Sequence, residues 1–209
     1  MQKILMPLAA LAVLALGFSV AIADHHEKKD GKSESAKVGA AAPTFSLQDT
    51  DGKTQNLADY AGKAVVLEWI NPDCPFVVRH YNLDTMTKLA DKHKDVVWLG
   101  VATGPTADAE KLKAFASKEN VQYPILLDSD GAIGKAYGAK TTPHMYIIDK
   151  EGKLVYAGAI DNDANGEPSA PLKDGTVNYV DQALTELASG SSISKAETKA
   201  YGCSVKYPK

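Results

Sequence analysis

Residues 65–80 read VVLEWINPDCPFVVRH and combine a buried strand, a turn and the start of a helix. Residues 65–70 form an almost continuous apolar run, which is typical of a strand covered on both faces. Residues 71–73, Asn-Pro-Asp, are a turn signal. Pro75 suits the first position of a helix, because its missing N–H leaves no hydrogen bond unmade there. Apolar residues at i+3 and i+4 spacing over 76–90 predict a helix with one buried face.

Cys74 lies where the predicted strand ends and the predicted helix begins. Unpaired backbone N–H groups and the helix dipole favour a thiolate at such a position. The pattern therefore predicts a nucleophile, and the alternative is a small buried side chain that happens to precede a helix. Asp73 opposes the thiolate, so we expect the pKa of Cys74 to be moderately lower than the value of about 8.5 for a free cysteine.

This segment resembles the active-site segment of the thioredoxin-fold superfamily, in the branch of exported redoxin and peroxiredoxin-like proteins that includes the alkyl hydroperoxide reductase and thiol-specific antioxidant proteins. The resemblance runs from Val38 to Ala188 and is best over 69–81 and 141–158. It implies an α/β, thioredoxin-like three-layer fold with a central mixed β-sheet. An N-terminal β-hairpin extension is expected at 42–57, around the Asp51-Gly52 turn signal.

The resemblance also assigns roles around the cysteine. Thioredoxins carry Cys-x-x-Cys, and Val77 takes the place of the second cysteine, which makes this a single-cysteine version. Thioredoxins keep a buried carboxylate six residues before the first cysteine, where this chain has Glu68, so we expect Glu68 to carry a proton and to have a raised pKa. Peroxiredoxins keep a threonine where this chain has Asn71, so peroxidase activity is expected to be weak.

A second matched segment begins at Thr141. Thioredoxin-fold proteins place a cis-proline opposite the reactive cysteine, and Pro143 corresponds to it. The residue before that proline, here Thr142, offers backbone hydrogen bonds to an extended substrate. His144 is interpreted either as a residue near the site or as an ordinary strand residue. Trp69 and Phe76 are expected to line the wall of the site rather than to react. The residues expected around the substrate are Asn71, Trp69, Thr142 and Pro143.

The length of 209 residues allows one domain with extensions. The N-terminus has Lys3, an apolar run over 8–20 and the small-residue site Ala-Ile-Ala at 21–23, the features of a secretory signal. The alternative is an uncleaved anchor, but the run is shorter than the roughly 20 residues that span a bilayer. The predicted organisation is a signal peptide at 1–23, a disordered linker at 24–37, a thioredoxin-like domain at 38–188 and a C-terminal tail at 189–209.

The tail carries Cys203, the second of the two cysteines. An even number of cysteines in an exported chain suggests a pair, and similar exported redoxins often end in a Gly-Cys-x-x-Lys segment like 202–206. We expect Cys203 to form a reversible disulfide with Cys74. The alternatives are a disulfide with a second chain and a spare thiol.

Two segments have weak metal-binding patterns. Residues 161–166 match the first half of a calcium loop, Asp-x-Asp-x-Asn-Gly, but Leu172 stands where a glutamate is wanted. Asp161, Asp163 and Asn165 are therefore either weak, millimolar calcium ligands or, the favoured interpretation, a polar loop tip. Cleavage after residue 23 would leave His26 third from a free amine, a pattern that binds Cu(II) or Ni(II). No other metal and no cofactor are expected.

The function predicted from these features is a thiol–disulfide oxidoreductase exported to the periplasm or an equivalent space. Cys74 attacks a disulfide, and Cys203 or an external thiol resolves the mixed disulfide. The partners are protein or small-molecule thiols and disulfides. A net charge of −3 without a basic stripe argues against nucleic acid, and no stable membrane insertion is expected after cleavage. The alternatives are a peroxiredoxin-like peroxide reductase and a copper-handling or docking module that uses the cysteines as ligands or structural groups.

Overall fold

The structure is a computed structural model that describes residues 35–209. The signal peptide expected at 1–23, His26 and most of the linker expected at 24–37 lie outside the described residues. Within the described range, none of the helices combines the length and the apolar character that a bilayer span requires.

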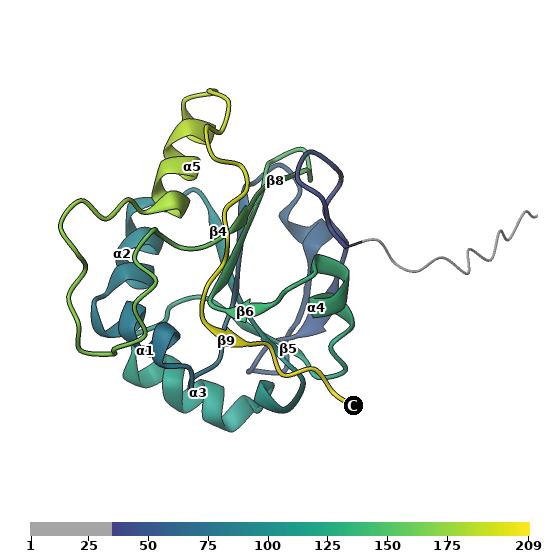
Figure 1. The fold of residues 1–209 in the computed structure, drawn as a ribbon. Coiled ribbons are helices and arrows are strands. Elements are labelled where there is room, and N and C mark those ends of the chain that lie inside the picture. The colour runs from purple at the N-terminus through teal and green to yellow at the C-terminus, as the bar shows by residue number, and fades with distance from the viewer. Residues whose placement is uncertain (1–34) are drawn as a thin grey trace, which may run out of the picture. The chain divides into compact units, whose positions relative to one another are not determined.

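A mixed five-stranded sheet forms the centre of the molecule (Figure 1). Its spatial order is β5-β4-β3-β7-β8, in which β3, β4 and β5 are parallel while β7 and β8 run antiparallel to their neighbours. The strands are β3 (Val65–Trp69), β4 (Val97–Thr103), β5 (Ile125–Asp128), β7 (His144–Ile148) and β8 (Leu154–Gly158). The predicted α/β fold class with a central mixed sheet is confirmed.

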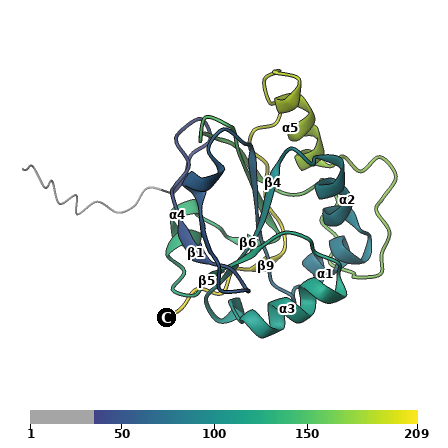
Figure 2. The ribbon, with the colours of Figure 1, turned by 180° about the vertical axis from the view of Figure 1, so that it is seen from behind.

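Helices cover both faces of this sheet, which makes three layers (Figures 1 and 2). One face is covered by α1 (Pro75–Asn82), α2 (Thr85–Lys92), α3 (Ala109–Lys118) and α5 (Tyr179–Ala188). The other face carries α4 (Ala132–Tyr137), the short helix η1 (Leu57–Tyr60) and the hairpin of β1 (Ser46–Gln48) and β2 (Thr54–Asn56). A second short helix, η2 (Gly104–Thr106), follows β4. The hairpin expected at 42–57 is therefore present, with strands shorter than predicted.

The single helix expected over 76–90 is two helices. Helix α1 ends at Asn82, and Asp84 takes a left-handed conformation with φ of 53° before α2 begins. A residue with positive φ cannot continue a right-handed helix, so the chain turns there although the apolar spacing continues. The i+3 and i+4 pattern is preserved because both helices turn their apolar sides to the same core.

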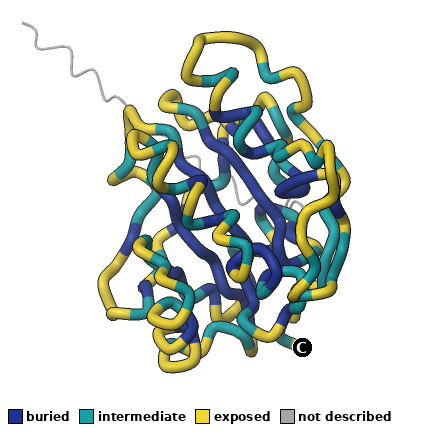
Figure 3. Tube along the Cα trace, turned by 90° about the vertical axis from the view of Figure 1, so that its left-hand side faces the viewer, coloured by how far each residue is buried: buried dark blue, intermediate teal, exposed yellow. Residues whose placement is uncertain are grey.

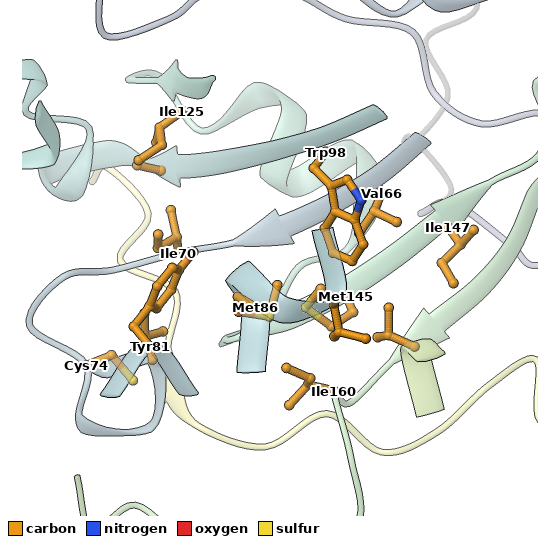
Figure 4. Packing of buried hydrophobic residues seen from close by; sticks show 14 of the residues in the cluster. Val66, Ile70, Cys74, Tyr81, Met86, Trp98, Ile125, Met145, Ile147 and Ile160 are labelled. Carbon is orange, nitrogen blue, oxygen red and sulfur yellow. The ribbon is translucent and has the colours of Figure 1, made fainter. Parts of the chain in front are cut away.

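The core is divided by the central sheet, because successive residues of a strand point to opposite faces. In β3, Val66 faces the cluster beneath α1, α2, α3 and α5, while Leu67 and Trp69 face the cluster beneath α4 and the hairpin. Figure 4 shows the first cluster, where Cys74 and Tyr81 lie close together at one end. The buried strands run between exposed loops (Figure 3).

The C-terminal residues run across the domain as an extended segment that we call the C-terminal strap, residues 196–208. The strap begins at β8, where the N–H of Ala157 donates to the carbonyl of Ala196 over 3.0 Å. Further on, strand β9 (Cys203–Ser204) pairs antiparallel with β6 (Thr141–Thr142). Figure 1 shows the strap in yellow across the front of the domain. The segment expected to be a tail is thus packed on the folded domain along much of its length.

Candidate active site

A turn places Cys74 at the N-terminus of α1. The Asn71 carbonyl accepts a hydrogen bond from the Cys74 N–H over 3.0 Å, and Asn71 Oδ1 accepts one from the Asp73 N–H over 3.0 Å. Cys74 then caps the helix, and its carbonyl accepts from the Val78 N–H. The side-chain oxygen of Asn71, which was expected beside the substrate, is thus occupied in holding the turn that presents the cysteine.

The thiol of Cys74 faces the Thr142–Pro143 segment, as the resemblance implied. The Cys74 thiol donates to the Thr142 carbonyl over 2.9 Å, and the Thr142–Pro143 peptide bond is cis. The Cys74 side chain is fully buried. Burial opposes the thiolate, but interactions with the side chains of Cys203 and Thr142 and with the backbone of Val77 and Cys203 outweigh burial and lower the pKa of Cys74.

Cys203 lies directly against this thiol. In the β6–β9 pair Cys203 stands opposite Thr142, whose carbonyl accepts from the Cys74 thiol, and the side chains of the two cysteines lie close enough to shift each other's pKa. Both cysteines are free thiols. Burial and the adjacent Cys74 raise the pKa of Cys203 to about 11. The two shifts are opposite in sign, so Cys74 ionises first and Cys203 holds its proton.

Glu68 sits beneath the helix that begins at Cys74. It lies on β3, is 1% exposed, and its Oε2 accepts hydrogen bonds from the hydroxyls of Tyr81 over 2.8 Å and Tyr123 over 3.0 Å. Its Oε1 is buried without a partner among the described residues. Burial raises the pKa of Glu68 to about 7, although both tyrosines lower it. The sequence predicted the burial and the raised pKa of Glu68 but did not predict either tyrosine.

Trp69 lies on the far face of the sheet from Cys74 and does not wall the site. Its indole N–H donates to Thr103 Oγ1 over 3.0 Å, and its ring packs against those of Tyr137 and Tyr146 at centroid distances of 5.4 and 5.1 Å. The prediction for Trp69 was wrong because adjacent strand residues point to opposite faces, and Glu68 already occupies the face of Cys74.

His144 lies on the same far face as Trp69, with which it is in register. Its Nδ1 lies 3.1 Å from the Tyr146 hydroxyl, and burial lowers the pKa of His144 to about 4. Of the two interpretations of His144, the structure favours the ordinary strand residue. Phe76, by contrast, stays beside Cys74 and packs against the strap through Tyr201, with ring centroids 5.9 Å apart.

Arg79 is buried and fixes the loop that follows β8. Its guanidinium pairs with Asp163 over 2.7 Å, and both side chains are almost wholly buried. The remaining N–H groups of Arg79 donate to the backbone carbonyls of Asp163, Asn165, Ala170 and Pro171 over 2.8 to 3.3 Å. The guanidinium is therefore saturated by the loop and presents no donor toward the Cys74 thiol.

The loop at 161–166 is not an exposed polar tip. Asp161 and Asp163 are 1% and 2% exposed, and Asp163 also accepts from the Lys173 backbone N–H over 3.1 Å. Arg79 thus stands where the calcium pattern would place a cation. Among residues 35–209 no three His, Cys, Asp or Glu side chains are grouped to hold a metal ion.

A buried polar chain connects the strap to α1 and to this loop. The Tyr201 hydroxyl donates to Asp161 Oδ1 over 2.5 Å and lies 3.0 Å from His80 Nε2. A hydroxyl has one proton, so His80 must donate from Nε2. Burial and the nearby Arg79 lower the pKa of His80 to about 4, and burial raises the pKa of Asp161. His80 is therefore neutral near pH 7 and donates to the Tyr201 hydroxyl, while Asp161 accepts from it.

Asp73, the exposed carboxylate beside Cys74, has a partner that the sequence did not reveal. Lys111 of α3 forms an ion pair with it. This pairing offsets the opposition that Asp73 presents to a neighbouring thiolate, although exposed pairs contribute little energy.

The Redoxin family matches residues 37–172. The chain is 30% identical over 163 residues to thiol-disulfide oxidoreductase ResA of Geobacillus thermodenitrificans (strain NG80-2), which covers 73% of this chain and 85% of that protein. It is 29% identical over 150 residues to ResA of Bacillus subtilis (strain 168), covering 68% of this chain and 76% of that protein.

Among solved structures, the chain is similar to that of an uncharacterized conserved protein from Geobacillus kaustophilus. The TM-score is 0.72 with 28% sequence identity, and the match covers 82% of this chain and 93% of that chain. The match extends well beyond the segment around the cysteine, so the whole domain shares this architecture.

Proposed function

This chain belongs to the redoxin family, and from that premise we propose that its thiol–disulfide oxidoreductase activity is carried by Cys74 as the nucleophile and Cys203 as the resolving thiol. The observation that carries the proposal is that both cysteines meet at Thr142, Cys74 through its thiol and Cys203 as the strand partner, with pKa values shifted in opposite directions. The thiolate is the attacking form of a cysteine, so the shifts support the order of attack.

The exchange proceeds in two balanced steps. The Cys74 thiolate attacks one sulfur of a partner disulfide, so a Cys74–partner S–S bond forms and the other partner sulfur leaves as a thiolate that takes up a proton. Cys203 then loses its proton and attacks the Cys74 sulfur, which releases the second partner thiol. The partner is reduced by two electrons, and the Cys74–Cys203 pair is oxidised. The reverse sequence oxidises a partner dithiol.

Glu68 is proposed to hold and return the proton of this exchange. Its pKa of about 7 lets it accept or give a proton near neutral pH. Tyr81, which donates to Glu68, belongs to the helix that begins at Cys74, and its hydroxyl is 2.8 Å from that of Tyr123. These hydroxyls lie on the same face of the sheet as Cys74 and support a route for the proton between Glu68 and the thiol.

Export is part of the proposal. The basic start, apolar run and small-residue site over residues 1–23 support a cleaved secretory signal, and an oxidising compartment beyond the inner membrane suits a reversible disulfide. The features of the site do not favour peroxide reduction, because Arg79 is saturated by the loop and Asn71 holds a turn.

Trapping with single-cysteine variants tests the proposal. The reduced Cys203→Ser protein, mixed with a protein disulfide substrate such as insulin, should accumulate a mixed disulfide on Cys74, because the resolving thiol is missing. The matched Cys74→Ser protein should form none, since burial, the largest cause of the raised pKa of Cys203, remains in this variant. Equal trapping by both variants, or trapping on Cys203 alone, would overturn the assignment of the nucleophile.

A further inference from the structure

The C-terminal strap lies beside the Cys74 thiol as an extended strand. Strand β9 pairs antiparallel with β6, and beyond it the Val205 N–H donates to the Lys140 carbonyl over 3.0 Å. The β6–β9 pair forms a two-stranded sheet of its own. Removal of β9 would therefore leave the backbone groups of β6 without their strand partner, and such an edge accepts an extended peptide through main-chain hydrogen bonds.

The residue before Cys203 has no room for a side chain. A Cβ added to Gly202 would lie 2.0 Å from the Thr142 carbonyl oxygen, 2.7 Å from the Thr142 carbonyl carbon and 3.3 Å from the Pro143 nitrogen. All three atoms are backbone, so no side chain can rotate away to make space. Gly202 also has φ of +130°, which favours glycine. A strand in this register must carry glycine immediately before its cysteine.

The residue two before Cys203 enters a subsite built for an aromatic hydroxyl. The Tyr201 ring packs on Phe76, and its hydroxyl reaches Asp161 and His80, each of which is 1% exposed. The buried Oδ2 of Asp161 and Nδ1 of His80 have no partner among the described residues. Loss of the hydroxyl would leave further buried polar atoms unpaired, which is costly.

We propose that the β6 edge binds an extended Tyr-Gly-Cys sequence and that the disulfide partner is a protein segment with the same aromatic-Gly-Cys pattern. The C-terminal strap occupies this edge as an internal segment of the same pattern. The inference rests on the proposed function and specifies its substrate. The partner cysteine takes the position of Cys203 when its S–S bond to Cys74 forms. The strap and the partner segment cannot occupy the β6 edge at the same time. When the strap returns, Cys203 attacks the Cys74 sulfur and the partner leaves as a thiol.

Activated peptides test this reading of the edge on the full chain. The probe is the octapeptide KAYGCSVK, the sequence of residues 199–206, with its cysteine in a disulfide with 5-thio-2-nitrobenzoate. Attack by the Cys74 thiolate on the peptide sulfur releases the coloured thiolate one for one. The comparison peptides replace the glycine by alanine or the tyrosine by alanine. Two proteins are compared, the Cys203→Ser chain and the Gly202→Ala, Cys203→Ser chain. The added methyl group of Gly202→Ala prevents the strap from pairing with β6.

The glycine peptide should react roughly tenfold or more faster than the alanine peptide with the Gly202→Ala, Cys203→Ser chain, because one extra methyl group meets a fixed backbone. The peptide with alanine in place of tyrosine should also be slower. The same chain should react with the glycine peptide roughly tenfold or more faster than the Cys203→Ser chain alone, because a tethered strap competes at an effective concentration of about a millimolar.

Gly190→Ala in the Cys203→Ser chain is the matched control. Gly190 also has a positive φ, of +72°, but an added Cβ there meets nothing within 4 Å, so this variant carries backbone strain without a collision. It should react like the Cys203→Ser chain. If Gly202→Ala prevents folding, Tyr201→Ala releases the strap by another contact and serves in its place.

Equal rates for the glycine and alanine peptides with the Gly202→Ala, Cys203→Ser chain would overturn the inference. It would also be overturned if this chain reacted with the glycine peptide no faster than the Cys203→Ser chain does. A small disulfide of 2-mercaptoethanol and thionitrobenzoate separates this failure from that of the proposed function. If Cys74 reacts with the small probe no faster than an ordinary thiol does, the proposed function itself fails. If it reacts faster than an ordinary thiol but does not distinguish the peptides, only the substrate inference fails.

Discussion

Replacing Glu68 with glutamine tests whether burial raises the pKa of this carboxyl. The side chain is 1% exposed, its Oε1 lacks a partner among the described residues, and burial raises its pKa from 4.5 to about 7. Glutamine keeps the shape and the acceptor oxygen for the two tyrosine hydroxyls but cannot ionise. The variant therefore removes the charge and little else.

The magnitude follows from the two pKa values. Below pH 4.5 Glu68 is protonated in the folded and the unfolded chain, so it carries no ionisation cost. Between pH 4.5 and 7 the unfolded chain ionises first, and stability falls as pH rises. Above pH 7 the full cost is present, about 3 kcal/mol at about 1.4 kcal/mol per pKa unit. Glutamine should be close to neutral at pH 4 and stabilising by about 3 kcal/mol at pH 8.5.

Urea unfolding of the reduced protein at pH 4, 5.5, 7 and 8.5 measures this difference, because contributions from the other titrating groups cancel between wild type and variant. Glu110→Gln is the control, since that side chain is 90% exposed and should show no comparable trend with pH. A Glu68→Gln stability difference that stays constant from pH 4 to pH 8.5 would refute a raised pKa at this position.

Three further outcomes are expected. Arg79→Met should lower the free energy of unfolding by about 3–5 kcal/mol, since Asp163 stays buried without its partner; urea titration measures this, and a loss below 1 kcal/mol argues against the buried pair. Tyr201→Phe should speed alkylation of Cys203 by loosening the strap, which peptide mapping after timed labelling checks, and an unchanged rate contradicts the anchoring role of the hydroxyl. Calorimetry at several millimolar calcium should give no heat, because Arg79 already neutralises Asp163, and measurable binding would disprove that explanation of the loop.

Local patterns were enough to find the reactive cysteine and its surroundings. Cys74 follows a buried strand and precedes a proline, which is a short-range signal for a helix N-terminus. The roles of Glu68 and Thr142 were predicted from their fixed spacing to Cys74 and to Pro143, which the chain shares with the family it resembles. These positions depend on neighbours in the sequence, so a single chain reveals them.

Contacts between distant segments account for what could not be predicted. Arg79 and Asp163 are 84 positions apart, and nothing local marks them as partners. Trp69 was misplaced because an apolar run that is buried on both faces does not say which residues face the helix of Cys74. The pairing of β9 with β6 depends on a segment that looked like a tail, although the clash at Gly202 explains why glycine precedes Cys203.

Mapping of the disulfide shows whether Cys74 and Cys203 of one chain are a redox pair. The reduced protein is oxidised mildly at low concentration, alkylated, digested without reductant and analysed by mass spectrometry. We expect a Cys74–Cys203 peptide pair from monomeric protein, which is lost on adding dithiothreitol. Two alkylated free thiols after oxidation, or a Cys203–Cys203 pair from dimers alone, would contradict it.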